Sequence, residues 1–539
     1  MTTPDHAIPT RDDAPAWSGF LPEAVVLALL MAWIYIHSWT NRWVFDDAFF
    51  FVRYARNILA GDGWCWNASM GPADGVTSPL WLALVTLGVA LAPEQWADNG
   101  LLLSWMSRLV MVAATIAFWA VGRSLLPRGW GVLALLPIVA LHFSSQVNFG
   151  FSGNIGMETP LAALLVVAHA GGMLHRQIEG GWLATRGGGV ALGILGVMGV
   201  LTRPEFGLLA LGAPLIQAFT LDRGRGTSCL AQLATTFGLL AIYALWRRWY
   251  FGDLVPLPAH VKGSVWSNPY GEIFTPNFHV IIGIGPMFLR DGGMMLLVAA
   301  LGLARPGAWR KLLWLWAPLL ATIAYMATTF MVMGTFQRYF LPYVSGALLL
   351  ALAAWFPRRD AGWGESLSPL LPPAPRLAAI VAVYLAIIGA IFTQTPWLQA
   401  RGYDISSTAH FPEELQRFSQ FPAGVSVAAT EVGLLAARNM HLTIHDIAGL
   451  NDVVYARGFD ADDLFARQPT VFAQVHDHYT KVVRDIRAHP DWQYYEAVFP
   501  PGATRDSPML RTIFDDTRSE HFETIRAILQ APMEQPRPQ

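Results

Sequence analysis

The chain has 539 residues, of which 54% are hydrophobic and only 14% charged, and its mean hydropathy is +0.38. Soluble domains carry about 25% charged residues, so most of this chain need not contact water. The net charge of −2 gives no overall attraction to nucleic acid, and two cysteines are too few for a disulfide framework. These values argue against a nucleic-acid partner and a disulfide-rich secreted fold, and they indicate a polytopic membrane protein.

The N-terminal region is a polar stretch followed by an apolar one. Residues 1–20 are slightly acidic and lack the basic region that opens a cleavable signal peptide. Residues 21–39 are long and apolar enough to cross a bilayer, which takes about 20 residues. We therefore expect a cytoplasmic tail over 1–20 and a retained first membrane helix.

Apolar stretches that suit membrane helices recur as far as residue 394. They cover residues 21–39, 100–122, 131–146, 157–174, 187–202, 206–220, 229–247, 291–305, 312–333, 338–356 and 376–394. The piece 79–93 is apolar but short, and it is either a span or a segment that enters the membrane and returns.

Basic residues in the loops decide between these topologies. They lie at Arg123/Arg128, Arg176/Arg186, Arg223/Arg225, Arg305/Arg310/Lys311 and Arg358/Arg359. Cytoplasmic loops carry an excess of Lys and Arg, and these loops share one side only if 79–93 makes no complete pass. The pattern predicts about eleven spans within 21–394, with outer loops 40–78 and 248–290. Arg247 and Arg248 fall on the outer side as exceptions.

The composition changes at about residue 395, where charged residues become frequent and spanning stretches end. We expect a small periplasmic α/β domain over 395–530 and a disordered tail over 531–539. Its expected elements are two strands, VSVAAT (425–430) and HLTIHDIAGL (441–450), and two helices, over 412–420 and 471–487.

The first outer loop carries two adjacent acids, Asp46 and Asp47, directly before the expected helix AFFFVRYARNIL. A carboxylate at the membrane surface can take the proton from an acceptor hydroxyl. The alternative is that one of them caps the helix N-terminus. Adjacent carboxylates can also bind a divalent cation, although no metal motif is present and no cofactor is firmly predicted.

Several charged residues at the expected outer ends of spans are further candidates. Arg53 and Arg56 share a helix face and would bind phosphate or face lipid headgroups. Glu158 opens a span, where an acid is costly unless it points into a protein-lined cavity, and helix capping is its alternative role. Trp64 and Trp66 would stack on a sugar ring or anchor the chain at the membrane interface.

Candidate phosphate-binding cations follow along the chain. They are Arg203, His260, Lys262 and Arg338. Arg offers a fork of donors that matches a lipid phosphate, whereas snorkelling to the interface is the simpler reading for each. Arg203 and Glu205 flank Pro204, so they can also pair with each other.

Ordered motifs along the chain carry a resemblance to a known family. They are DDAFFFVRYARNILAGDGWCWN and ADGVTSPLW in the first loop, then GMETPL (156–161), TRPEFG (202–207), YFGDLVPLPAHVKG (250–263), QRYFLP (337–342) and HDIAGLND (445–452). This order resembles the GT-C glycosyltransferases, and most closely the arabinofuranosyltransferases that finish the mycobacterial cell-wall arabinan. Asp74 stands where the family pattern has Glu, and Pro256-Leu257 where it has Pro-Asn.

The resemblance implies a GT-C fold and transfer of a sugar from a polyprenyl-phosphate donor to a periplasmic acceptor in the bacterial inner membrane. It implies Asp46 as the catalytic base, with Asp47 as the close alternative. It also implies cations that hold the donor phosphate, with Asp74, Glu158 and Glu205 nearby.

The identities of donor and acceptor stay open within this reading. The first choice of sugar is arabinofuranose and the second is mannose or another hexose. The acceptor is a glycan, a lipid-linked glycan or a protein. A non-enzymatic flippase or transporter is the competing hypothesis, although the internal repeat expected of many transporters is not visible.

Overall fold

The computed structural model describes short pieces between residues 24 and 32 and then most of the chain. The described ranges are 44–125, 156–178, 181–220, 223–262, 302–304, 307–327, 341–355, 413–473, 475, 479–498 and 513–531. The expected spans 131–146 and 376–394 and nearly all of 291–305 lie outside these residues. So do the expected tail over 1–20, all but residue 531 of the tail over 531–539, and Arg338.

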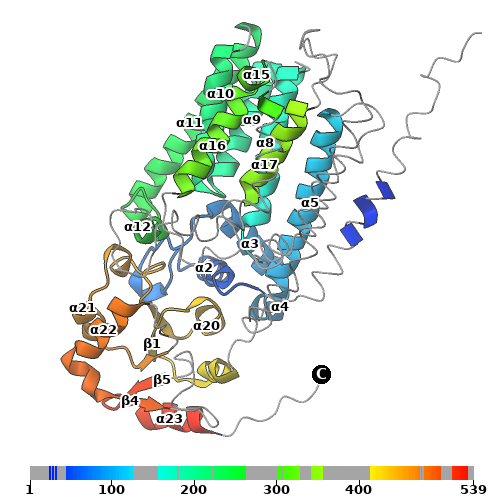
Figure 1. Cartoon of the computed structure of the whole chain (residues 1–539). Coiled ribbons are helices and arrows are strands. Elements are labelled where there is room, and N and C mark those ends of the chain that lie inside the picture. The colour runs from blue at the N-terminus through cyan, green and yellow to red at the C-terminus, as the bar shows by residue number, and fades with distance from the viewer. Residues whose placement is uncertain are drawn as a thin grey trace, which may run out of the picture.

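A bundle of helices forms the upper half of the molecule in Figure 1. It comprises α5 (Leu101–Leu125), α8 (Thr159–Ile178), α9 (Arg186–Val200), α10 (Gly207–Thr220), α11 (Arg223–Phe251), α16 (Leu313–Ala327) and α17 (Leu341–Trp355), with the short η2 (Trp182–Ala184), η3 (Pro204–Phe206) and α15 (Ala308–Lys311) at helix ends. The described parts of the apolar stretches between residues 100 and 356 are therefore helical, as predicted, with residues 302–304 of 291–305 too short to judge. Helix α8 packs between α5 and α17, and α10 contacts both α11 and α16.

Small residues allow α9 and α11 to approach closely. A Cβ atom at Gly189 would lie 2.1 Å from the carbonyl oxygen of Ser228, so only glycine fits there. Leu101–Leu125 and Arg225–Phe251 are long and apolar enough to cross a bilayer. Four shorter apolar helices lie beside them in the described part of the chain: Pro79–Leu91, Arg186–Val200, Leu313–Met326 and Pro342–Ala354.

The first loop lies between the bundle and the C-terminal domain (Figure 1). Its described part contains α2 (Ala48–Ala60) and η1 (Ala68–Met70). The helices α3 (Pro79–Leu91) and α4 (Glu94–Asp98) follow it, and α12 (Leu257–Lys262) lies at the same level. The 13 residues of α3 rise about 20 Å, less than the roughly 30 Å hydrocarbon core. This length agrees with the expectation that 79–93 makes no complete pass.

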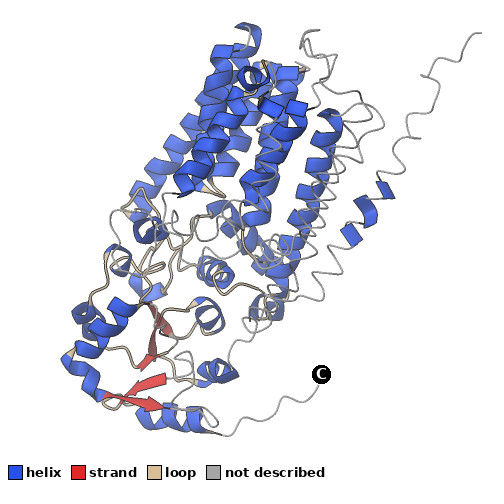
Figure 2. Cartoon of the chain, viewed as in Figure 1, coloured by secondary structure: helices blue, strands red, loops and turns tan. Residues whose placement is uncertain are grey.

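The strands of the described residues lie only at the lower end of the molecule, drawn red in Figure 2. They form one mixed sheet in the order β2-β1-β3-β5-β4, in which β1 pairs in parallel with β2 and β3, and β5 pairs antiparallel with β3 and β4. Their bounds are β1 Ser426–Ala429, β2 Thr443–Asp446, β3 Val471–Phe472, β4 Tyr495–Val498 and β5 Ile513–Asp516. Around the sheet lie η6 (Glu413–Gln420), α20 (Gly433–Arg438), η7 (Tyr455–Arg457), α21 (Ala461–Ala466), α22 (Thr480–Ala488), η8 (Pro490–Tyr494) and α23 (Phe522–Gln530).

The two strands predicted in this domain are confirmed as β1 and β2. The helix predicted over 471–487 is wrong at its start, because the buried Val471 and Phe472 form β3 and the helix begins only at Thr480. Within the helix expected over 412–420, the described residues Glu413–Gln420 form the 3-10 helix η6.

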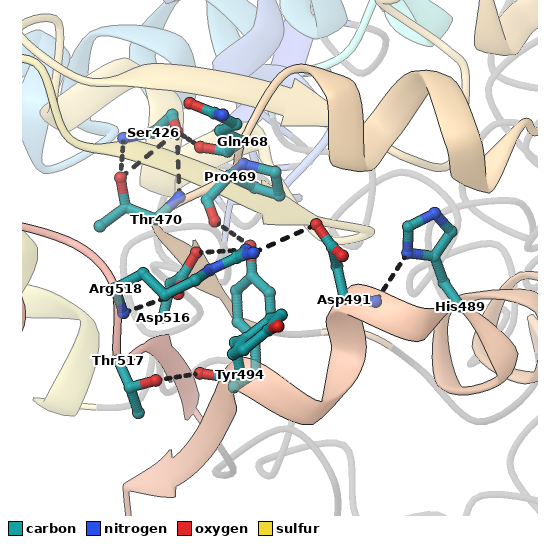
Figure 3. Close-up of polar contacts among 11 residues, drawn as sticks. Ser426, Gln468, Pro469, Thr470, His489, Asp491, Tyr494, Asp516, Thr517 and Arg518 are labelled. Carbon is teal, nitrogen blue, oxygen red and sulfur yellow. Dashed lines mark hydrogen bonds and ion pairs between the residues drawn. The ribbon is translucent and has the colours of Figure 1, made fainter.

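Side-chain contacts fasten the strand ends of this sheet (Figure 3). Arg518 pairs with Asp516 at 3.0 Å and with Asp491 at 3.2 Å, which joins β5 to η8. Ser426 and Thr470 exchange hydrogen bonds between their backbone N–H groups and side-chain oxygens, which joins β1 to the start of β3.

Candidate active site

The described candidate residues converge where the first loop meets the C-terminal domain, a region we call the junction. Leu80 of α3 donates to the carbonyl of Leu201, which lies two residues before Arg203 (3.0 Å). Leu257 of α12 donates to the carbonyl of Asp74 (3.0 Å). Segments far apart in the sequence are therefore tied together at one end of the bundle.

Asp46 contacts the C-terminal domain directly. Its two carboxylate oxygens accept hydrogen bonds from the backbone N–H groups of Gly433 (2.7 Å) and Leu434 (2.8 Å), in the first turn of α20. The side chain keeps partial exposure to solvent. Burial and the nearby carboxylate of Glu431 raise the pKa of Asp46 to about 7, against the opposing effect of the two N–H donors. A carboxyl that titrates near neutrality suits a general base.

Asp47 occupies the N-cap position of α2 but makes no side-chain cap hydrogen bond. The first-turn N–H groups of α2 donate instead to backbone carbonyls, including Ala48 to Phe45 (3.1 Å) and Phe49 to Asp46 (2.9 Å). Neither acid therefore caps α2 through its side chain. The Asp46 carboxylate binds α20, and backbone carbonyls accept the hydrogen bonds of the first N–H groups of α2.

A third acid, Glu431, joins this pair from the turn after β1. Burial, followed by the charge of Asp47, raises the pKa of Glu431 to about 8. Like the two aspartates it is partly exposed. We call Asp46, Asp47 and Glu431 the acid cluster. Glu431 was not predicted from the sequence, because it joins the two aspartates only where segments far apart in the chain meet.

Arg53 anchors α2 to the C-terminal domain. The buried guanidinium donates to the carbonyls of Trp66 (2.6 Å), Ala436 (2.6 Å) and Leu442 (3.1 Å), and to the side chain of Asn67 (2.7 Å). All three guanidinium nitrogens are thus occupied, so the arrangement is that of a structural anchor.

Arg56 and the two tryptophans also serve the packing of this region. Arg56 pairs with Asp98 at 2.7 Å and donates to the carbonyl of Ala437. Trp66 is buried and its indole N–H donates to the carbonyl of Ile444 (2.9 Å), so the expectation that it stacks on a sugar is wrong. Trp64 packs against Trp246 and Phe251 of α11.

Asp74 forms a buried ion pair with Arg247, one of the two arginines that were exceptions to the predicted topology. Burial raises the pKa of Asp74 to about 6, and the charge of Arg247 opposes that rise. Arg247 also donates to the carbonyl of Leu254 (3.0 Å) and to Tyr243 (3.2 Å). Its Nη2 is buried and has no hydrogen-bond partner among the described residues.

Glu158, Arg203 and Glu205 form a second charged group. Arg203 donates to Glu158 (2.7 Å) through Nη1 and to Glu205 (2.8 Å) through Nε, and Glu158 and Arg203 are buried. Two residues before Glu158, a Cβ at Gly156 would lie 2.7 Å from the Cβ of Ala48, so this turn packs on the start of α2. In the described part of the chain, the second oxygen of Glu158 has no hydrogen-bond partner.

His260 is the described member of the remaining phosphate-binding candidates. It pairs with Asp253 at 2.9 Å, and the same Asp253 oxygen accepts from Arg457 of η7 (2.9 Å). Lys262 ends α12, whereas Arg338 falls outside the described residues. Among the residues that the structure describes, no group of three or more His, Cys, Asp or Glu side chains is placed to hold a metal ion.

The HDIAGLND segment binds mainly to itself and to the first loop. Asp446 is fully buried and accepts hydrogen bonds from the backbone N–H groups of Ala448 (3.0 Å) and Asn451 (2.9 Å). The hydroxyl of Tyr54 on α2 donates to the Asn451 side chain (3.2 Å). This motif therefore shapes the loop that meets α2.

The chain is similar in sequence to two glycosyltransferases. The chain is 29% identical over 269 residues to the terminal β-(1→2)-arabinofuranosyltransferase of Mycobacterium tuberculosis, covering 47% of this chain and 40% of that protein. It is 27% identical over 310 residues to the enzyme of the same name from Corynebacterium glutamicum, covering 52% and 44%. The chain thus spans less than half the length of these relatives. No family model matches it.

The sequence resemblance to arabinofuranosyltransferases is confirmed. Among solved structures, ArnT from Cupriavidus metallidurans bound to undecaprenyl phosphate superposes with a TM-score of 0.55 at 14% identity, over 95% of this chain and 99% of that chain. The arabinofuranosyltransferase AftD from mycobacteria superposes with a TM-score of 0.48 at 15% identity, over 92% and 40%. The chain therefore has the fold of a GT-C membrane glycosyltransferase.

Proposed function

We propose that the chain is a membrane glycosyltransferase that moves a sugar from a polyprenyl-phosphate donor to an acceptor hydroxyl in the periplasm. Arabinofuranose is the first choice of sugar, because the curated relatives are arabinofuranosyltransferases. The observation that carries the proposal is Asp46, a partly exposed carboxyl with a pKa near 7 at the junction where the candidate motifs meet. Mannose or another hexose is the alternative donor sugar.

In the proposed reaction the acid cluster accepts one proton. Asp46 takes the proton from the acceptor hydroxyl, whose oxygen attacks the anomeric carbon of the sugar. The bond from the anomeric carbon to the phosphate oxygen breaks, and the polyprenyl phosphate leaves with the electron pair. Asp47 is the alternative base, because it follows Asp46 directly and is also partly exposed.

Cations at the junction stabilise the charge that develops on the leaving phosphate. The proposed phosphate ligands are Arg203, His260, Lys262 and Arg338. Arg203 and His260 each already bind a carboxylate, so each would divide its hydrogen bonds between that partner and the phosphate. Arg247 is a further cation, because its Nη2 is buried without a partner among the described residues. Arg53, Arg56, Asp74, Glu158 and Glu205 hold the surrounding segments in place.

The proposed orientation places the junction and the C-terminal domain in the periplasm. Basic residues gather at the opposite end of the bundle: Arg225 donates to the carbonyl of Gln177 (2.6 Å), and Gln177 donates to the carbonyl of Lys311 (2.9 Å). Arg176, in the last turn of α8, lies beside them. Such a cluster favours the cytoplasmic side of a bacterial inner membrane.

The acceptor and the roles of the remaining parts of the chain are proposed as follows. The acceptor is a glycan, a lipid-linked glycan or a protein, and the domain over 395–530 would shape its binding groove. Residues 1–20 would lie in the cytoplasm, before about eleven spans.

The test is turnover of a radiolabelled lipid donor by the purified full-length chain. Decaprenyl-phosphate arabinofuranose is offered with an arabinan oligosaccharide acceptor, and decaprenyl-phosphate mannose is the matched control. We expect label in the acceptor from the arabinose donor. If only the mannose donor labels the acceptor, mannose replaces arabinofuranose as the proposed donor sugar. A chain in proteoliposomes that moves the donor between leaflets without forming product would instead be a flippase.

A further inference from the structure

We propose that the C-terminal domain positions the base on the first loop, through the backbone N–H groups of Gly433 and Leu434 at the start of α20. The two N–H groups hold the Asp46 carboxylate in the orientation that proton transfer needs. This inference rests on the proposed function, because it assigns positioning residues for the same transfer reaction. It gives the C-terminal domain a part in the chemistry itself, beyond the shaping of an acceptor groove.

The carboxylate of Asp46 is bound at both of its oxygens. The N–H of Gly433 donates to Oδ2 (2.7 Å), and the N–H of Leu434 donates to Oδ1 (2.8 Å). Because the two donors come from successive residues, they fix the orientation of the carboxylate as well as its place. A carboxylate offers about four acceptor positions, so about two remain for the hydroxyl of a sugar acceptor.

The start of α20 fits against the backbone of Asp46 only as glycine. A Cβ built at Gly433 would lie 2.0 Å from the backbone oxygen of Asp46 and 2.8 Å from its Oδ2. Real Cβ atoms do not approach so closely, so any side chain at Gly433 would push α20 and the first loop apart. This close approach brings the two N–H groups within hydrogen-bond distance of the carboxylate.

Contacts at the opposite end of α20 fix its place along α2. Arg53 donates to the carbonyl of Ala436 (2.6 Å), and Arg56 donates to that of Ala437. The first loop thus offers an acid to the N–H groups at the start of α20 and two arginines to the carbonyls at its end. Each charge has the sign that this helix terminus favours. The arginines therefore hold α20 beside Asp46 even when one N–H donor is removed.

The two N–H donors oppose the charged side chains that act on Asp46. Those side chains are Glu431, in the turn before α20, and Asp47, and both raise the pKa of Asp46, whereas the N–H groups lower it. The arginines of α2 and α20 donate to backbone carbonyls instead. The N–H groups of α20 therefore favour the ionised carboxylate, which is the form that accepts a proton.

The test removes the Leu434 donor alone and measures the pH profile of transfer from the lipid donor. Leu434→leucic acid, introduced into the full-length chain by nonsense suppression, replaces the N–H by an ester oxygen and keeps the side chain. Because the ionised carboxylate loses one donor, we expect the acidic limb of kcat to move up by about one pH unit. Donor KM should be unchanged, since the proposed phosphate ligands are other residues.

Leu464→leucic acid in α21 is the matched control. It makes the same chemical change in the same domain, where the N–H of Leu464 donates to the carbonyl of Asp460 (3.2 Å). This variant should keep the wild-type pH profile, even if both esters lower the thermal midpoint. An acidic limb of Leu434→leucic acid that stays at the wild-type position, moves lower, or moves no further than that of the control overturns the inference.

Gly433→Ala tests the contact in a second way, with Gly238→Ala on α11 as its control. Gly433→Ala should lower kcat about tenfold or more with donor KM unchanged, because a displacement of even 1 Å at a reacting group is costly. A Cβ at Gly238 meets nothing within 4 Å, so that variant should retain wild-type turnover. Equal turnover in the two alanine variants contradicts the positioning role.

Asp46→Asn, measured alongside, separates this inference from the proposed function. Full activity in Asp46→Asn removes the base assignment itself, and the positioning role falls with it. If Asp46→Asn is inactive and the acidic limb of Leu434→leucic acid does not move up, the base assignment stands and only the positioning role is overturned.

Discussion

Two kinds of acid lie at the junction, and they differ in their partners. Asp74 is buried against Arg247, and Glu158 is buried against Arg203. Asp46 has backbone N–H donors and another acid as neighbours. The pKa of Asp74 rises only to about 6, whereas that of Asp46 rises to about 7, since a cation offsets the cost of burial for Asp74 alone.

The difference separates acids that hold the structure from acids that exchange protons. An acid paired with arginine, such as Asp74, has a cation that offsets the cost of its burial, and it ties two segments together. An acid held by N–H groups beside another acid titrates close to neutrality and can accept a proton during turnover.

The largest expected effect is on stability, in Asp74→Asn. Removing this carboxylate leaves the Arg247 charge buried without compensation, which costs about 3 to 5 kcal/mol. Thermal unfolding in detergent measures the loss. The double variant Asp74→Asn/Arg247→Met should recover most of it. Arg457→Met is the control, because its exposed pair with Asp253 contributes about 1 kcal/mol or less. If Asp74→Asn and the control lose equal stability, the buried Asp74–Arg247 pair is no more important to folding than an exposed one.

The next effect is the pH dependence of transfer by the wild type. Asp46 must be deprotonated to act as a base, and its pKa is about 7. We therefore expect kcat to rise between pH 6 and 8, with about a tenfold loss for each pH unit well below the pKa. Single-turnover rates across this range test the prediction. A flat profile from pH 5 to 8 would assign the proton transfer to an acid with an ordinary pKa.

The smallest effect concerns Asp515, a buried acid of the C-terminal domain that lies outside the junction. It is fully buried in β5, both carboxylate oxygens lack hydrogen-bond partners in the described part of the chain, and burial raises its pKa to about 8. An acid with a raised folded pKa binds more protons folded than unfolded. Its stabilising contribution is therefore full below about pH 4 and is lost as the pH rises through 8.

Asp515→Asn should remove this pH-dependent loss. The thermal midpoint of the variant should match the wild type or lie lower at pH 5 and exceed it at pH 9. Midpoints of both full-length chains at the two pH values measure the effect. If the difference in thermal midpoint between the two chains is the same at both pH values, Asp515 does not titrate in the folded state.

Local patterns predicted the elements well, because hydropathy is encoded within each segment. The helices α5 and α8 fall where the apolar stretches 100–122 and 157–174 placed them, and β1 and β2 fall within the two predicted strands. The error at Val471 has a local cause as well. A two-residue strand is too short to show an alternating pattern, so its residues were assigned to the helix that follows.

The contacts of the candidate site were harder to predict than its residues. Asp46 stood out beside Asp47 at the start of a helix, but its N–H donors lie 387 and 388 residues away. Arg247 looked like an exception to the topology because its partner Asp74 is 173 residues earlier. No periodicity or charge pattern reports such pairings, and for that reason Glu431 also escaped prediction.

Whether Asp46 is the base is decided by comparing Asp46→Asn with the wild type in transfer from decaprenyl-phosphate arabinofuranose. Donor binding and thermal unfolding are measured on the same preparations. We predict that transfer falls by about 10²- to 10⁴-fold while donor affinity and folding persist, because only the proton acceptor is lost. Transfer at the wild-type rate from a folded Asp46→Asn protein would contradict the assignment of Asp46 as the base.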